Sequence, residues 1–195
     1  MFKSTNQLLV EYQEYQDPYS KIRQLVQSGD LIPLKRGLYE TDPHVLPASL
    51  ANCFYGPSYL SFEYALSWYG MIPERVTVYT SATFNKRRKK EFSNAFGTYT
   101  YQDVPAEAYP HAYIQMSSGS YPYLMAMKEK ALCDELSIIP PIRGIHAFHE
   151  YLFEGMRLDE NIFEELDSDM LRFLAPKYHK TNLDQLLRLL NGQGR

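Results

Sequence analysis

Near the start of the chain, the spacing of apolar residues changes from that of a helix to that of paired strands. Apolar residues recur at helical spacing after Asp17 and stop at Gly29, two residue types that suit the two ends of a helix. A second apolar group surrounds Gly37, which permits a tight turn between two strands. The pattern predicts a helix over residues 18–28, followed directly by a hairpin that ends near Glu40.

Two cations, Lys35 and Arg36, stand at the tip of this predicted hairpin. A helix followed by a basic hairpin is typical of a recognition helix and wing, where the helix lies in the major groove and the hairpin contacts phosphate. Residues 1–40 are not net basic, so any affinity for DNA depends on where their charges lie. Their five cations are Lys3, Lys21, Arg23, Lys35 and Arg36, against the five acids Glu11, Glu14, Asp17, Asp30 and Glu40. A purely structural helix and hairpin is the alternative interpretation.

The residues before this helix have room for one short helix, with a cap at Thr5 or the next residue and an end near Gln16. Two prolines predict an extended linker over residues 41–51. We place the domain boundary in this linker. The prediction is an abbreviated winged helix-turn-helix-like module at residues 1–45 and a second domain at residues 46–195.

The second domain is predicted to mix strands and helices up to residue 138 and to be helical beyond it. The expected strands are 75–82 and 96–101, which would pair antiparallel, and 111–115. The expected helices are 58–70, 124–138, 145–153, 162–166, 169–174 and 183–190. The sequence therefore predicts an α+β fold: a small N-terminal module plus a larger mixed α/β domain with an antiparallel sheet and a helical C-terminus.

Five consecutive cations stand between two of the predicted strands: Lys86, Arg87, Arg88, Lys89 and Lys90. Their mutual repulsion on one loop costs free energy that salt screening only lessens, so a compensating anion is expected, and nucleic-acid phosphate is the obvious candidate. The alternative is a hairpin tip that only aids solubility. Between Glu150 and Asp169, by contrast, eight acids face one cation, Arg157. Such a run is a solvated face or a docking surface for a basic partner.

Composition limits the class of protein. The 195 residues carry a net charge of -3, and 14% of them are aromatic, which indicates a packed and partly polar fold. Two cysteines far apart, Cys53 and Cys133, indicate neither a disulfide framework nor a zinc site. The first residues lack the apolar core of a signal peptide, and no apolar run approaches the roughly 18 to 20 residues that span a bilayer. The expectation is a cytoplasmic protein that does not contact membrane.

The familiar motifs of nucleotide-binding, P-loop, zinc-protease and esterase sites do not occur in the sequence, so no cofactor is expected. His146 and His149 are three residues apart on a predicted helix but lack further ligands at suitable spacing, so no metal site is expected. A metal-dependent nuclease is the last-ranked alternative. Its centre would combine Asp103, Glu107, Glu129 and Lys130.

Taken in order, five segments resemble the AbiEi-type antitoxin and transcriptional-regulator family of type IV toxin-antitoxin (abortive infection) systems. They are LIPLKRGLYE (31–40), PSYLSFEYALSWYGMIPE (57–74), TSAT (80–83), FGTYTY (96–101) and KEKALCDEL (128–136). The resemblance extends over roughly residues 29–138. Each segment alone is a weak indication of the family. The resemblance depends on all five segments occurring in this order.

The resemblance implies a winged helix-turn-helix that binds the promoter of its own operon and a C-terminal domain with antitoxin activity. It implies no catalysis, a nucleotidyltransferase-like toxin as the opposed partner, and a role in phage defence. It places Ser20, Lys21, Arg23 and Gln24 on the recognition helix, and operator binding of this kind often involves a homodimer. Family members usually carry three helices before the wing, whereas this chain has room for only one before residue 17. A protein-interaction module without DNA binding stays open as an alternative, with the acidic C-terminal helices as its docking surface.

Overall fold

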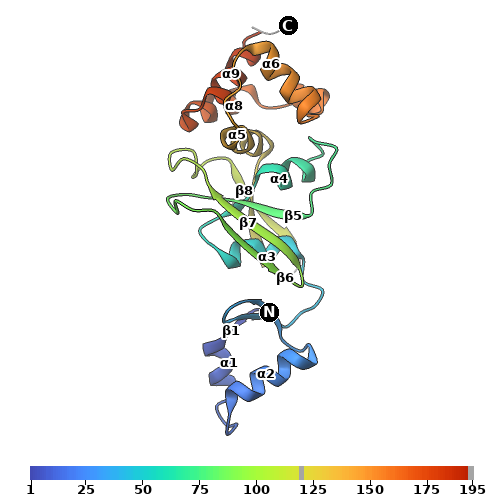
Figure 1. Ribbon diagram of the computed structural model, residues 1–195, viewed down its shortest axis with the longest axis vertical. Helices are drawn as coiled ribbons and strands as arrows, with labels where there is room; N and C mark the ends of the chain where they lie inside the picture. Colours follow the sequence, from blue (N-terminus) through green and yellow to red (C-terminus); the bar gives the residue numbers. More distant parts are fainter. Residues whose placement is uncertain (119–120, 193–195) are drawn as a thin grey trace.

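The computed structural model describes residues 1–118 and 121–192. Figure 1 shows three parts stacked along the longest axis of the molecule: an N-terminal module, a layer built on a sheet, and a group of C-terminal helices. The fold is therefore mixed α and β, with a helical C-terminus, as the sequence predicts.

The N-terminal module comprises two helices and a three-stranded sheet in the order β1-β3-β2. Its elements are β1 (Lys3–Ser4), α1 (Thr5–Glu11), α2 (Pro18–Ser28), β2 (Ile32–Lys35) and β3 (Leu38–Glu40). Asp17 caps α2 by accepting a hydrogen bond from the Ser20 amide, and Gly29 ends it at φ +84°, so the predicted caps are confirmed. The first helix differs from the prediction, because Ser4 caps it through a capping box with Gln7 and it ends at Glu11.

The middle layer holds a six-stranded sheet in the order β6-β7-β5-β4-β9-β8. Its elements are α3 (Pro47–Phe54), β4 (Tyr59–Leu60), α4 (Phe62–Trp68), β5 (Val78–Thr83), β6 (Lys90–Asn94), β7 (Gly97–Asp103), β8 (Tyr113–Ser118), β9 (Tyr121–Ala126) and α5 (Lys128–Ile138). Three of the five neighbouring strand pairs are antiparallel, and β5–β7 and β4–β9 are parallel. Figure 1 shows α3 on the side of the sheet that faces the N-terminal module, and α4 and α5 on the side of the C-terminal helices.

The predicted antiparallel pairing of residues 75–82 with 96–101 is wrong, since β5 and β7 are parallel, with Val78 opposite Thr98. The reason is β6, a strand that the sequence pattern did not reveal. It begins at Lys90, the last cation of the basic run, and pairs antiparallel with β7 at the edge of the sheet. Two reversals of direction between β5 and β7 leave those two strands parallel.

Three other boundaries differ from the prediction. Residues 41–51 are not an extended linker, because α3 begins at Pro47, where proline is tolerated in the first helical turn, and Leu50 is fully buried. The predicted helix 58–70 begins at Phe62, since the two residues before its cap form the buried strand β4. The predicted helix 124–138 begins at Lys128, since the residues before it end β9.

The C-terminal helices are close to the predicted ranges; α8, η2 and α9 pack on α5, and α6 packs on α9. They are α6 (Ile145–Glu150), the π-helical turn η1 (Tyr151–Gly155), α7 (Glu160–Glu164), α8 (Ser168–Leu174), the 3-10 turn η2 (Ala175–Tyr178) and α9 (Thr181–Leu190). A single apolar core joins these helices to the sheet, whereas Leu8, Ile22 and Leu31 form a separate small core in the N-terminal module.

A buried ion pair joins α5 to its neighbours. Lys130 and Asp134 have no solvent exposure, and Lys130 Nζ lies 3.2 Å from Asp134 Oδ1. Asp134 also accepts hydrogen bonds from the hydroxyls of Tyr59 in β4, Ser61 before α4 and Tyr178 in η2. Burial, with the charge of Asp134 beside them, raises the pKa of Tyr59 and Tyr178. The network therefore connects the sheet, α5 and the C-terminal helices through one satisfied polar cluster.

Candidate nucleic-acid interface

One face of α2 is open to solvent and carries the predicted helix residues. Ile22 turns inward to the module core, while Ser20, Arg23 and Gln24 are exposed. Lys21 is half-buried, with its Nζ 5.3 Å from the centre of the Tyr15 ring. The structure therefore brings the four predicted residues of this helix to one short stretch of surface.

The guanidinium of Arg23 makes only exposed contacts within its own helix. Its Nη2 donates to Ser20 Oγ at 2.9 Å and lies 3.8 Å from Asp17 Oδ2. Hydrogen bonds from the Ser20 amide and the charge of Arg23 hold the pKa of Asp17 below its ordinary value. Exposed ion pairs of this kind contribute little free energy, so Arg23 can exchange its contacts for those of a ligand.

The two cations predicted at the hairpin tip have different surroundings. Arg36 is exposed beside Gly37, which turns the hairpin at φ +79°. Lys35 points back to the middle layer, where its Nζ donates to the carbonyl oxygen of Phe54 at 2.7 Å. That carbonyl belongs to the last turn of α3, where a cation is favourable. Of the predicted pair, only Arg36 therefore presents its charge to solvent at the tip.

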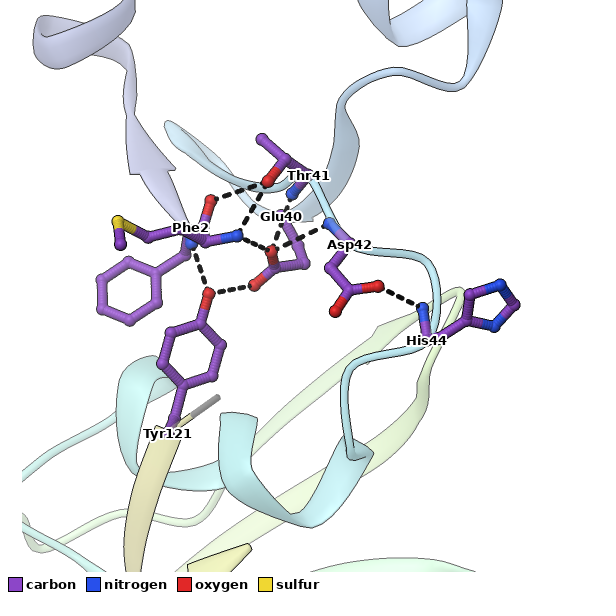
Figure 2. Close-up of polar contacts among 7 residues, drawn as sticks. Phe2, Glu40, Thr41, Asp42, His44 and Tyr121 are labelled. Carbon is purple, nitrogen blue, oxygen red and sulfur yellow. Dashed lines mark hydrogen bonds and ion pairs between the residues drawn. The ribbon is translucent and has the colours of Figure 1, made fainter. Parts of the chain in front are cut away.

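Glu40 fixes the N-terminal module to the middle layer, as Figure 2 shows. The carboxylate is fully buried and accepts hydrogen bonds from the Tyr121 hydroxyl at 2.8 Å and from the amides of Thr41 and Asp42. The terminal ammonium of Met1 lies 2.6 Å from Glu40 Oε1. Burial alone would raise the pKa of Glu40, but these donors outweigh it and hold that pKa below its ordinary value. Sequence reasoning missed Glu40, because its donors come from both ends of the module and from β9.

The basic run Lys86–Lys90 is held by Asp103 of β7. The amides of Lys86 and Arg87 both donate to Asp103 Oδ2 at 2.7 Å, and the Lys86 ammonium donates to the carbonyl of Gly56. Arg87, Arg88 and Lys89 are exposed. The run is not wholly a loop, because Lys90 is the first residue of β6.

The exposed part of the run lines a cleft of about 570 Å³. Arg87, Arg88 and Lys89 form one wall, and Lys180, just before α9, contributes a fourth cation. Ser137 of α5 also lines the cleft. Asp103 is the one acid among the described residues that line the cleft, so four cations outweigh one carboxylate and create a positive potential that attracts phosphate.

The structure does not bring the basic run together with α2. Asn94 at one end of β6 donates to the carbonyl of Leu34 in the hairpin, while Lys90 stands at the other end. At about 3.3 Å per residue, the strand separates the two by roughly 13 Å. The predicted residues therefore form two surfaces, one on α2 and the hairpin and one around the cleft.

The residues of the predicted nuclease centre do not form a metal site. Asp103 holds the basic run, Glu107 lies 3.2 Å from His179, and Glu129 accepts a hydrogen bond from the amide of Asp167. Lys130 is occupied in the buried ion pair. Within residues 1–118 and 121–192, no group of three or more His, Cys, Asp or Glu is arranged to hold a metal ion.

His146 and His149, the other pair considered from spacing, lie exposed on α6, and the ring of His149 packs against Phe153. No helix in the described part of the chain is long and apolar enough to cross a membrane.

No protein-family model matches the chain, and no curated protein sequence matches it. The family resemblance therefore depends on the five segments themselves. In the structure these segments include the β2–β3 hairpin, β4 with α4, part of β5, most of β7, and most of α5.

Proposed function

We propose that the protein is a non-catalytic antitoxin of the AbiEi type and a DNA-binding autorepressor, with an abbreviated winged helix-turn-helix as its DNA-binding module. The observation that carries the DNA-binding part is the open face of α2, where Ser20, Arg23 and Gln24 stand together while the opposite face packs into the module core. The antitoxin part depends on the resemblance of the five segments.

In this proposal α2 lies in the major groove. Arg23 and Gln24 have the donor geometry that reads guanine and adenine, and Lys21 lies beside them. Ser20 and Arg36 contact phosphate. The strand β1 pairs with β3 and so widens the small sheet behind the hairpin, which supports its use as a wing despite the single helix before α2.

The cleft lined by the basic run is proposed as a second phosphate contact. Because β6 separates it from the hairpin, it would bind backbone away from the base pairs that α2 reads. Lys35 is left out of the proposed contacts, since its ammonium is directed at the end of α3.

The partners follow from the resemblance. The operator lies upstream of the protein's own operon, a homodimer is the form that matches an inverted repeat, and the opposed toxin is nucleotidyltransferase-like. The action would take place in the cytoplasm, in defence against phage.

The test is fluorescence anisotropy with a labelled duplex from the upstream region and a scrambled duplex of equal composition, from about 50 to about 200 mM salt. We expect Arg36→Ala to reduce the slope of log affinity against log salt by about 1, and Arg23→Ala to cost about 1–3 kcal/mol of discrimination between the two duplexes. Replacing residues 86–90 by Ala should weaken both duplexes equally. Arg188→Ala is the matched control, because Arg188 is exposed on α9 in the C-terminal layer.

The proposed interface would be refuted by DNA binding that is insensitive to salt. It would also be refuted if Arg36→Ala left the slope of log affinity against log salt unchanged while Arg188→Ala altered it. Equal affinity for the two duplexes together with a normal salt slope would leave a backbone-binding protein and remove the assigned reading role of α2.

A further inference from the structure

A second pocket, which we call the acidic pocket, lies on the other side of the sheet from the N-terminal module, between α4, α5 and η1. It has a volume of about 260 Å³. Three acids, Glu63, Glu74 and Glu135, line it together with the apolar side chains Leu66, Ile72, Val76 and Met156. The pocket therefore combines negative charge with apolar walls.

One carboxylate oxygen of Glu135 is the polar atom in this pocket that lacks a hydrogen-bond partner. The residue is 7% exposed, and its Oε2 accepts no hydrogen bond from any residue that the structure describes. A buried polar atom without a partner costs free energy, and a buried carboxylate costs more unless a cation or donor reaches it. The unpartnered oxygen, in a side chain that lines the pocket, marks a place where a donor would be stabilised.

The charges around Glu135 are of the wrong sign to compensate it. Glu63 on α4 and Asp134 on α5 are both acidic, and the acid Glu74 at the rim is engaged by Arg157 at 3.1 Å. Burial, reinforced by Glu63 and Asp134, raises the pKa of Glu135 to about 7, and the backbone amide of Glu63 offsets only part of that rise.

We propose that the acidic pocket binds one organic cation, an ammonium or guanidinium group carried on an apolar stem. The charged group would donate to the carboxylates of Glu135 and Glu63, and the stem would lie along the apolar walls. The Tyr151 ring, which lines the pocket from η1, adds a face on which a cation is attracted.

The lining favours an organic cation over a metal ion. Magnesium and calcium need about six or more oxygen ligands, whereas the pocket offers three acids among aliphatic side chains, and one of them, Glu74, is already paired with Arg157. No triad of metal ligands occurs in the described ranges of the chain. A lysine or arginine side chain of a partner protein and a free amine share the chemistry that the pocket would recognise.

The probe for the free form is butylguanidine, a guanidinium on a four-carbon stem, and N-butylurea serves as its neutral counterpart. The probe for the side-chain form is a short capped peptide with a single arginine, compared with the same peptide carrying citrulline. Isothermal titration calorimetry at pH 8 measures all four. We expect the cationic member of at least one pair to bind and its neutral counterpart to bind at least about tenfold more weakly.

Glu135→Gln keeps the shape of the side chain and should weaken binding of the cation by about tenfold or more. Glu150→Gln is the control, because Glu150 is exposed on α6 outside the pocket, and it should change little. Affinity should fall as the pH is lowered from 8 to 6, since Glu135 gains a proton across this range. The other ionisable groups that face Glu135 are Glu63, Asp134 and Tyr151, and burial raises the pKa of Tyr151 above its ordinary value.

A measurement on the unmutated protein guards against misfolding of the variant. The side-chain carboxyl carbon of Glu135, followed by NMR, should report a lower pKa when butylguanidine is present. The proposal is overturned if neither butylguanidine nor the arginine peptide binds at about 10 mM. It is also overturned if Glu135→Gln binds the cation as well as the parent protein does, or if magnesium alone reproduces the NMR change. DNA binding by Glu135→Gln should be unchanged, so failure here leaves the regulator proposal untouched.

Discussion

Breaking the buried Lys130–Asp134 pair should destabilise the protein more than removing it altogether. Asp134→Asn leaves the Lys130 ammonium buried with only neutral acceptors, the Ala108 carbonyl and the Tyr178 hydroxyl, both at 2.7 Å. Removing one partner of a buried ion pair costs about 3–5 kcal/mol, because the remaining charge stays out of water without compensation. We expect Asp134→Asn to fall in this range.

Lys130→Met should cost less than Asp134→Asn. The carboxylate of Asp134 would keep three hydroxyl donors, from Tyr59, Ser61 and Tyr178, whereas the ammonium in the other variant loses its anionic partner. The double variant removes both charges, so its loss should be smaller than the sum of the single losses by at least about 2 kcal/mol.

The parent protein, the two single variants and the double variant form a double-mutant cycle. Urea unfolding followed by circular dichroism at pH 7 gives their four free energies of unfolding. Asp184→Asn is the matched control, since Asp184 is exposed on α9, and it should change stability by no more than about 0.5 kcal/mol. Strict additivity of the two single variants, or a loss below about 1 kcal/mol for Asp134→Asn, would refute the view that the pair is a coupled buried charge network.

Three further outcomes are expected. Glu135→Gln should stabilise the protein at pH 8 by up to about 3 kcal/mol and have little effect at pH 4. The reason is that the pKa of Glu135 is raised to about 7 in the folded state, so the folded state loses stability as the pH rises above 4.5. Urea unfolding of both proteins at the two pH values measures the difference. Glu40→Gln should lower the free energy of unfolding by about 1–3 kcal/mol at pH 7, and by progressively less below pH 4.5. The lowered pKa of Glu40 means that the carboxylate stabilises the folded state, and this stabilisation is lost as the carboxylate gains a proton. Amide hydrogens of residues 1–40 should exchange faster in the variant to the same extent. Lys35→Met should lower the free energy of unfolding by about 1 kcal/mol yet leave the salt dependence of DNA affinity unchanged. A weaker salt dependence would contradict the placement of the Lys35 ammonium at the end of α3.

The elements that sequence predicted correctly are those whose ends are determined locally. Asp17, Pro18 and Gly29 define α2 through a cap, a preset first turn and a left-handed stop, all within thirteen residues of chain. The C-terminal helices follow from their own periodicity in the same way. A local signal was enough in each case, and packing did not override it.

The errors arise where a local signal supported two structures. Pro47 indicated a linker, but proline also suits the first turn of a helix, and the buried Leu50 shows that packing on the sheet decided the outcome. Lys90 was counted with a charged loop, although an edge strand commonly carries lysine. Once β6 takes the edge, β5 and β7 must be parallel, and no property of their own residues records that.

The candidate site was predictable only in part, for a similar reason. Exposure of Ser20, Arg23 and Gln24 follows from helical periodicity, which places them away from Ile22. The direction of the Lys35 ammonium depends on where α3 ends, and the absence of a partner for Glu135 Oε2 depends on how α4 and η1 pack on α5. Long-range packing sets both, so spacing along the chain gave no signal for either.

The arrangement of the layers also bears on how a protein of net charge -3 could bind a polyanion. Many of its acids lie in the run Glu150–Asp169 of the C-terminal layer, and the sheet layer separates them from α2 and the hairpin. Exposed charges further apart than about 8 Å hardly interact at physiological salt. At the proposed interface, the potential around Arg23 is therefore set by nearby charges, above all by Asp17 at 3.8 Å, and the formal net charge is a poor guide to it. It follows that neutralising acids of the C-terminal layer should leave DNA affinity unchanged, whereas Asp17→Asn should raise it.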